Sequence, residues 1–335
     1  MRPVQRTVLV TGATGFVGSA LVPALAAAGH RVRATSRRRR AGPGGTVDWM
    51  AVDVRRPDDL ERALEGVDAA YFLVHGMAAG RGDYVEEERR TAAGFVRAAA
   101  RAGTGRIVYL GGVAPQGTPS RHLASRLAVG EVLRAGRVPA LELRASMIVG
   151  AGSASWQVVR DLAMRLPVML LPAWARSRTC PVWIGDVVGA LVAGIDLPLP
   201  ASAVHDLPGP DVLEVREILE RVAALRGRRL PAARVPLPVP RVSMLWLKLI
   251  SGADWRVVRE LVQGLATDLL PRDARFWQLA GLPAPLPFDE AARRALAGEP
   301  AGEGLRGAMA ALEEALVDRC APRLGPVSPG EPRSR

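Results

Sequence analysis

Cysteine is scarce in this sequence. The 335 residues include two cysteines, Cys180 and Cys320, which lie far apart and outside any CxxC or other metal-ligand spacing. Disulfide-stapled folds and zinc sites need more cysteines than this, at closer spacing. We therefore expect neither a disulfide framework nor a metal site, and a reducing compartment fits the sequence best.

Long apolar runs are absent as well. A membrane-spanning helix needs about 18 or more uninterrupted apolar residues, and the apolar stretch Val182–Leu199 is broken by Asp186 and Asp196. The first residues lead directly into a strand and a glycine loop, without the apolar segment of a secretion signal. We expect a soluble, cytoplasmic protein that does not bind membranes.

Lysine is almost absent, although the net charge is +12. Of the 45 basic residues one, Lys248, is lysine; the others are arginines spread along the chain, with a single run at Arg37–Arg40. A basic composition without a recognisable binding module is a poor indicator of nucleic-acid binding. We expect a small-molecule substrate and no nucleic-acid partner, and the sequence is compatible with an oligomer.

Apolar strands alternate with amphipathic helices in the first half of the chain, which predicts an α/β fold with a doubly wound parallel sheet. The expected strands are 7–11, 31–35, 47–52, 69–74, 106–110 and 140–144, and the expected helices are 16–28, 57–65, 84–102 and 120–135. Residues 1–150 should form a Rossmann domain, to which residues of about 175–210 return. Residues 151–320 should form a smaller, mainly helical lobe, and residues 321–335 a disordered tail.

The segment VLVTGATGFVGSALV joins the first strand to the first helix. In such a loop the first glycine permits a tight turn, the second lets a pyrophosphate approach the backbone, and the third lets the helix pack on the strand. The helix N-terminus then offers N–H groups and a partial positive charge to the phosphates. A dinucleotide site is therefore expected at Gly12, Thr14, Gly15, Phe16, Val17 and Gly18.

The end of the second strand bears on the choice of cofactor. An NAD site normally has Asp or Glu about 20 residues after the loop, bound to the ribose 2′-hydroxyl. Here the strand ends in Ser36-Arg37-Arg38, and a guanidinium can pair with the 2′-phosphate of NADP. NADP(H) is therefore expected over NAD(H), with Arg37 as its ligand, although a solvated basic loop would have the same sequence.

Two further residues follow strands at the same edge of the expected sheet. Asp53, after the third strand, is expected either to accept a hydrogen bond from the adenine amino group or to cap the next segment. His75, after the fourth strand, is expected near the nicotinamide half of the cofactor.

Several segments resemble the short-chain dehydrogenase/reductase superfamily, in its atypical, NmrA-like branch. Beside the GxxGxxG pattern of Gly12–Gly18, the similar segments are Tyr71–Met77, His122–Glu131, Leu143–Ser155 and Leu207–Leu213. The resemblance covers roughly residues 5–295 and implies a Rossmann fold with an NAD(P)(H) cofactor. The segments are most similar to a bacterial NAD(P)H-binding subgroup of this branch. Because most members of that subgroup have no assigned substrate, the resemblance implies less about the reaction.

The superfamily reduces carbonyls with a tyrosine acid, a lysine four residues later, and a serine or threonine after the fifth strand. Here the segment after that strand is Leu110–Val113, without a hydroxyl, and His122 and Arg126 replace the tyrosine and lysine. Residues four apart share one helix face, and a histidine with a pKa of about 6.5 can be a general acid. We expect His122 and Arg126 to be catalytic, with Ser120 and Ser125 as candidate hydroxyl donors; the alternative is a surface histidine and no catalysis.

The segment after the sixth strand should leave the sheet at its carboxyl edge, where doubly wound folds bind ligands. A mostly apolar substrate pocket is expected there, lined by Met147, Ser153, Ser155, Trp156 and Trp174. For each tryptophan taken alone, a place in the core of the smaller lobe is favoured.

Two functions fit the sequence. The first is an NADPH-dependent oxidoreductase acting on a small apolar carbonyl, quinone or enone, in which His122 and Arg126 replace the usual pair. The second is an NADP(H)-binding sensor or regulator of the NmrA-like type, without turnover, which the missing tyrosine, lysine and serine favour. The sequence slightly favours the oxidoreductase and does not identify its substrate.

Overall fold

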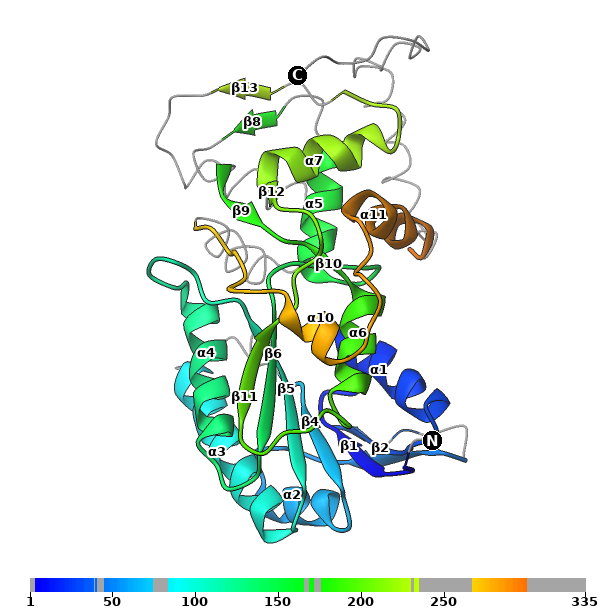
Figure 1. Ribbon diagram of the computed structural model, residues 1–335, viewed down its shortest axis with the longest axis vertical. Helices are drawn as coiled ribbons and strands as arrows, with labels where there is room; N and C mark the ends of the chain where they lie inside the picture. The colour runs from blue at the N-terminus through cyan, green and yellow to red at the C-terminus, as the bar shows by residue number, and fades with distance from the viewer. Residues whose placement is uncertain are drawn as a thin grey trace.

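Parallel strands form the central sheet of the molecule (Figure 1). The computed structural model describes residues 4–38, 40, 45–74, 84–165, 169–171, 176–229, 232–234 and 267–299. The strands of the sheet are β1 (Thr7–Val10), β2 (Arg31–Ser36), β3 (Val47–Ala51), β4 (Ala69–Phe72), β5 (Arg106–Gly112), β6 (Ala140–Ala145) and β11 (Ala203–Asp206). Their order is β11-β6-β5-β4-β1-β2-β3. Because the order reverses between β1 and β4, the predicted doubly wound parallel sheet is confirmed.

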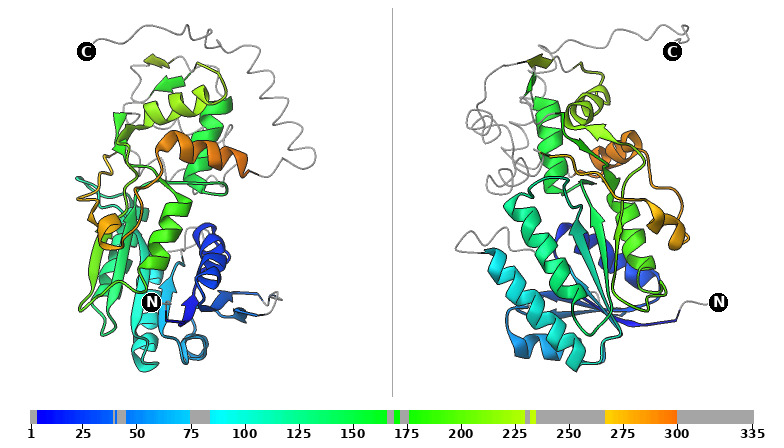
Figure 2. Two further views of the ribbon diagram at one scale, coloured as in Figure 1. Left: turned by 45° about the vertical axis from the view of Figure 1, so that its right-hand side comes forward. Right: turned by 60° about the vertical axis from the view of Figure 1, so that its left-hand side comes forward.

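Helices cover both faces of this sheet. Helices α1 (Phe16–Ala27) and α6 (Ile184–Ala193) pack on one face, whereas α2 (Pro57–Leu64), α3 (Tyr84–Arg101) and α4 (Arg121–Arg134) pack on the other (Figure 2). Every residue of β4 and β6 is consequently buried. Burial on both faces explains why β1 and β4 are almost continuously apolar rather than alternating.

The helix starts have different local causes. Ser120 caps α4, because its hydroxyl accepts the N–H of Leu123 at 3.3 Å. Helix α2 begins with a proline and two acidic residues, which suit the first turn of a helix. Helix α1, in contrast, has neither a side-chain cap nor an acidic residue in its first turn. Its N-terminal N–H groups and dipole therefore suit an anion.

A second, smaller lobe lies beyond the carboxyl ends of the strands (Figure 1). Its helices α5 (Ala154–Arg165), α7 (Val215–Ala224) and α11 (Phe288–Ala297) pack around an apolar core that contains Trp156 and Phe288. Three strand pairs accompany them: β7 (Ile148–Val149) with β10 (Val182–Trp183), β9 (Arg178–Thr179) with β12 (Leu213–Glu214), and β8 (Met169–Leu171) with β13 (Ala232–Arg234). The lobe closes over the sheet edge where ligands of such folds bind.

The chain passes between the large sheet and the small lobe more than once. Helix α6 packs on the large sheet and β11 is one of its strands, although β7 and α5 of the small lobe precede both in the sequence. Near the end of the described chain, α10 (Arg275–Leu279) packs on β11, where the rings of His205 and Phe276 lie 5.5 Å apart. Trp277 Nε1 also donates a hydrogen bond to the carbonyl oxygen of Pro208 at 3.1 Å. The sequence did not predict helix α10, because a five-residue helix has too little periodicity to be recognised.

Some sequence expectations concern residues that the structure does not describe. His75, Trp174 and the tail 321–335 lie outside the described residues. Among the described helices, none combines the length and the apolar character needed to cross a membrane.

Candidate active site

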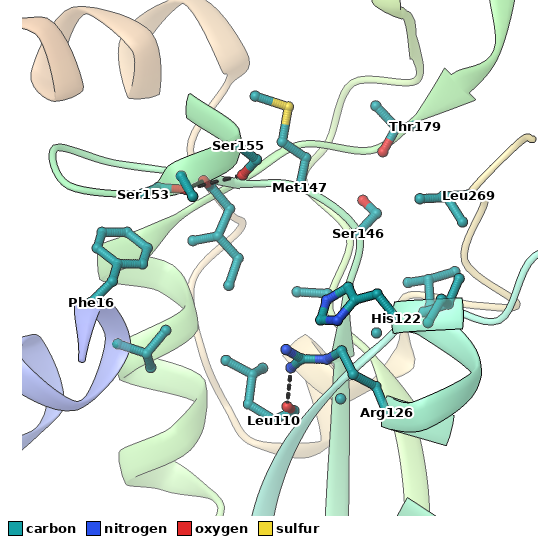
Figure 3. Close-up of a pocket in the computed structure, with 18 of the residues that line it drawn as sticks. Phe16, Leu110, His122, Arg126, Ser146, Met147, Ser153, Ser155, Thr179 and Leu269 are labelled. Carbon is teal, nitrogen blue, oxygen red and sulfur yellow. Dashed lines mark hydrogen bonds between the residues drawn. The ribbon is translucent and has the colours of Figure 1, made fainter. Parts of the chain in front are cut away.

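A cavity of about 300 Å³ lies where the carboxyl ends of the central strands meet the second lobe (Figure 3). The glycine loop borders it on one side, α4 on another, and α5, α7 and Leu269 on the side of the small lobe. Most of its lining is apolar, and none of its described lining residues is acidic. The described ranges also contain no group of three or more His, Cys, Asp or Glu side chains that would suit a metal ion.

The three glycines of the loop leave space for different neighbours. Gly12 has a φ of +68°, and a Cβ on it would lie 2.5 Å from the carbonyl oxygen of Leu73. A Cβ on Gly18 would lie 2.3 Å from the carbonyl oxygen of Gly12. Both positions therefore need glycine for the chain's own packing.

Gly15 is different. Its φ of −78° suits any residue, and a Cβ on it would meet a single atom within 4 Å, the carbonyl oxygen of Gly12 at 3.3 Å. The space that it leaves opens into the cavity, at the uncapped first turn of α1. This combination of open backbone and unpaired N–H groups fits the pyrophosphate of a dinucleotide.

The structure brings most of the expected loop residues to the cavity. Its lining includes Gly12, Gly15, Phe16, Val17 and Gly18. Thr14 is exposed on the same turn and is not among the lining residues.

Arg37 and Asp53 lie beyond the cavity, at the carboxyl ends of β2 and β3. Arg37 is exposed. The Asp53 carboxylate accepts hydrogen bonds from the Arg55 side chain at 2.9 and 2.6 Å and from its backbone N–H at 3.1 Å. Arg55, and more weakly Arg37, lower the pKa of Asp53. Asp53 thus orders the turn before α2, in keeping with the capping alternative.

The first turns of α4 place His122 and Arg126 side by side in the cavity (Figure 3). Arg126 Nη2 donates a hydrogen bond to the carbonyl oxygen of Leu110 at 2.5 Å. The Tyr109 hydroxyl donates to the carbonyl oxygen of Arg126 at 3.0 Å. Strand β5 therefore holds this part of α4 through both the backbone and the side chain of Arg126.

The protonation of His122 differs from the expectation. Burial, and then the positive charge of Arg126, lower its pKa to about 3. The expected pKa of about 6.5 is therefore corrected, because a buried imidazole beside a cation resists taking up a proton. Its Nδ1 is buried without a hydrogen-bond partner in the described structure. A neutral imidazole still offers one N–H donor and one acceptor nitrogen, but it has no extra proton to release.

The candidate hydroxyl donors of α4 have separate surroundings. Ser120 lines the cavity and caps the helix. Ser125 is buried and donates a hydrogen bond to the carboxylate of Glu88. Of the two, only Ser120 is therefore at the cavity.

The residues expected on the substrate side are divided between cavity and core. Met147, Ser153 and Ser155 line the cavity, with the two serine hydroxyls 3.0 Å apart. Trp156 is fully buried in the core of the small lobe, and its Nε1 donates to Glu299 at 3.0 Å. The core alternative therefore describes Trp156.

Sequence reasoning missed other lining residues. Ser146 directly follows β6, and its position at the carboxyl edge of the sheet is a signal that could have identified it. Thr179 and Leu269 are far apart in the sequence and meet at an isolated bridge between β9 and the segment at 269. The sequence contains no local signal for this long-range pairing.

Comparison with known proteins identifies the family. Residues 8–132 match the NAD dependent epimerase/dehydratase family. A 3-diazoavenalumate denitrifying reductase of a Streptomyces species is 31% identical over 268 residues, which are 68% of this chain and 86% of that protein. The chain belongs to this family of extended short-chain dehydrogenases/reductases, which are NAD(P)-dependent reductases and epimerases, and its cofactor is an NAD(P) nucleotide.

Two further relatives are similar over most of their length. Ceramide reductase of Caulobacter vibrioides is 28% identical over 236 residues, 69% of this chain and 74% of that protein. Sterol demethylase protein B of Methylococcus capsulatus is 27% identical over 287 residues, 81% of this chain and 83% of that protein. The solved structure of a nucleoside-diphosphate-sugar epimerase from Staphylococcus aureus shares the fold, with a TM-score of 0.67, at 17% identity over 86% of this chain and 99% of that chain.

Some relatives are much longer than this chain. Uncharacterized proteins of Mycobacterium tuberculosis and Mycobacterium bovis are 30% identical over 250 residues, and the match covers 73% of this chain but 26% of theirs. The chain therefore spans about a quarter of the length of these relatives.

Proposed function

We propose that the chain is an NADPH-dependent oxidoreductase that reduces a small apolar carbonyl compound, quinone or enone. The observation that carries the proposal is a single, mostly apolar cavity bordered by both the glycine loop and the His122–Arg126 pair. Hydride transfer needs the cofactor and the substrate in contact, so the residues that bind the cofactor and those that act on the substrate must border the same cavity. The names of two relatives refer to ceramide and to sterols, which supports an apolar substrate.

The loop and the end of β2 divide the binding of the cofactor between them. The N–H groups of the first turn of α1 bind the pyrophosphate in the space beside Gly15, whose own N–H donates to the carbonyl oxygen of Gly12 at 2.9 Å. Arg37, exposed at the end of β2, pairs with the 2′-phosphate and favours NADPH over NADH. When bound, the nicotinamide supplies a hydride to the substrate.

His122 and Arg126 act on the oxygen of the substrate. The neutral imidazole donates its N–H to the carbonyl oxygen, and the guanidinium of Arg126 stabilises the negative charge that grows there as hydride arrives. Solvent then supplies the proton that completes the alcohol. Because the donors are already oriented by α4, their hydrogen bonds strengthen in the transition state without reorganisation.

The test is NADPH oxidation with a panel of aliphatic aldehydes, ketones, enones and quinones, each paired with an analogue that carries a carboxylate. We expect turnover with the apolar members and much less with their charged partners, because most of the lining is apolar and its guanidinium, Arg126, is assigned to the reacting oxygen, so that a second negative charge would lack compensation. Equal rates for the charged and uncharged partners would contradict the apolar assignment.

A second function is an NADP(H)-binding sensor of the NmrA-like type. It is favoured by Gly111 and Gly112, which leave no hydroxyl at the end of β5, and by the neutral state of His122. Tight NADPH binding without oxidation of NADPH by any member of the panel would favour the sensor over the enzyme.

A further inference from the structure

Glu142 is a buried carboxylate with no part in the proposed reaction. It lies on β6 with 0% of its surface exposed. Its Oε2 accepts a hydrogen bond from Arg134 Nε at 2.7 Å, and its Oε1 accepts one from Arg144 Nε at 2.7 Å. Burying such charges is costly, and well-packed apolar residues often give equal or greater stability. Stability alone therefore does not explain why Glu142 is buried between two arginines.

The carboxylate occupies a slot between β5 and α4 whose walls are glycines. A Cβ on Gly130 of α4 would lie 2.5 Å from Glu142 Oε2, and one on Gly111 of β5 would lie 2.8 Å from Glu142 Oε1. Atoms this close to a carboxylate cannot coexist with it, so a side chain at either position would displace Glu142 or push α4 away from the sheet.

The neighbouring glycine also allows the close approach of α4. A Cβ on Gly112 would lie 2.6 Å from Leu123 Cδ1. Gly111 and Gly112 follow Leu110, in the segment where the family resemblance leads one to expect a serine or threonine. The missing hydroxyl thus has a structural reason, because this part of β5 leaves room for Glu142 and for the first turns of α4.

One face of α4 joins the slot to the cavity. His122, Arg126, Gly130 and Arg134 recur every four residues, so each neighbours the next along a stripe that winds slowly round the helix. The first two line the cavity, and the last two face Glu142. A helix is stiff over this distance, so its position at Glu142 determines the position of the two cavity residues.

We infer that Glu142 is a positioning residue: its pairing with Arg134 in the glycine slot sets where α4 lies on the sheet, and hence where His122 and Arg126 stand in the cavity. The effect of Glu142 on turnover rests on the proposed function. Its effect on the surroundings of His122 does not, and the two are measured separately.

The first measurement follows His122 by NMR in the full chain, which contains four histidines. Glu142→Gln keeps the size of the side chain and removes its charge. We expect α4 to move and water to reach His122, so that its pKa rises by about one unit or more. Glu131→Gln makes the same change on the exposed side of α4 and should leave the pKa unchanged. An unchanged pKa of His122 in Glu142→Gln would overturn the inference.

The second measurement uses turnover. Glu142→Gln should lower kcat by about 10- to 100-fold, the cost of a small misplacement of reacting groups, while the Kd of NADPH stays within twofold. In a background that carries both His122→Ala and Arg126→Ala, the same substitution should cost little more, because residues that act through one another are not additive. Fully additive losses would indicate a general structural role and overturn the inference.

Arg134→Gln provides a second variant if Glu142→Gln does not fold. The Arg134 side chain is 27% exposed, so its replacement is tolerated more easily than a change in the buried partner. It should reproduce both the change at His122 and the loss of kcat. A change at His122 without any carbonyl reduction by the wild type would retain the positioning role and reject the proposed enzyme.

Discussion

The two ends of the cavity are built from different parts of the chain. At the loop end, the backbone around Gly15 faces the cavity, and the first turn of α1 has neither a cap nor an acid. At the α4 end, the side chains of His122 and Arg126 face it. Backbone N–H groups keep the same chemistry wherever the loop is exposed. The chemistry of an imidazole, in contrast, depends on burial and on its neighbours.

This difference predicts that the two ends can be damaged separately. A change at the loop end should abolish cofactor binding, and a change at the α4 end should abolish turnover while the cofactor still binds. A variant at the α4 end that lost cofactor binding as well, without unfolding the chain, would show that the division is wrong.

Gly15→Val should have the largest effect. The φ of −78° accepts valine, but the side chain occupies the space that the pyrophosphate needs. We expect the affinity for NADPH to fall by at least about 1000-fold, or about 4 kcal/mol, with the melting temperature little changed. Gly18→Ala, whose Cβ would lie 2.3 Å from the Gly12 carbonyl oxygen, should instead destabilise the fold by about 1–3 kcal/mol. Undiminished NADPH binding by folded Gly15→Val would exclude the loop as the site.

His122→Ala should reduce turnover by about 100- to 1000-fold, the usual effect of removing one donor to a developing oxyanion. The Kd of NADPH should barely change, and the same substitution at His205, which lies outside the cavity, should leave turnover intact. Because the pKa of His122 is lowered to about 3, this residue gives turnover no dependence on pH between 6 and 8. A rate that falls with a midpoint of about 6.5, and loses that midpoint in His122→Ala, would argue for an imidazolium acid instead.

Arg37→Asp should weaken NADPH binding by at least about tenfold, because a hydrogen bond between charged groups contributes about 1.5–3 kcal/mol. The affinity for NADH should be unchanged or improved. Arg31→Asp, at the exposed opposite end of the same strand, is the matched control and should alter neither affinity. A wild type that binds NADH more tightly than NADPH would count against the role of Arg37.

The residues of the loop end could be proposed from the sequence because their signal is local. The strand, the three glycines and the helix are consecutive. The atoms that a Cβ on each glycine would meet belong to the same segment or to Leu73, which directly follows β4. The pairing of His122 with Arg126 was also predictable from their spacing of four. The state of His122 was not, because its low pKa depends on burial in the folded chain. Glu142 was missed for a similar reason: its slot is made by glycines from two other elements.

The smallest predicted effect concerns stability in acid. The pKa of His122 is about 3 in the folded chain and about 6.5 in an unfolded one. Between these values the unfolded chain takes up a proton at this residue and the folded chain does not, so stability falls as the pH drops below about 6.5, and above that pH the residue makes no difference. At pH 5.5 the loss should be about 1.4 kcal/mol. Denaturant unfolding of the wild type and of His122→Gln, compared at pH 7.5 and 5.5, measures it: the variant should lose less stability by about this amount, whereas equal losses would mean that His122 is protonated in the folded chain.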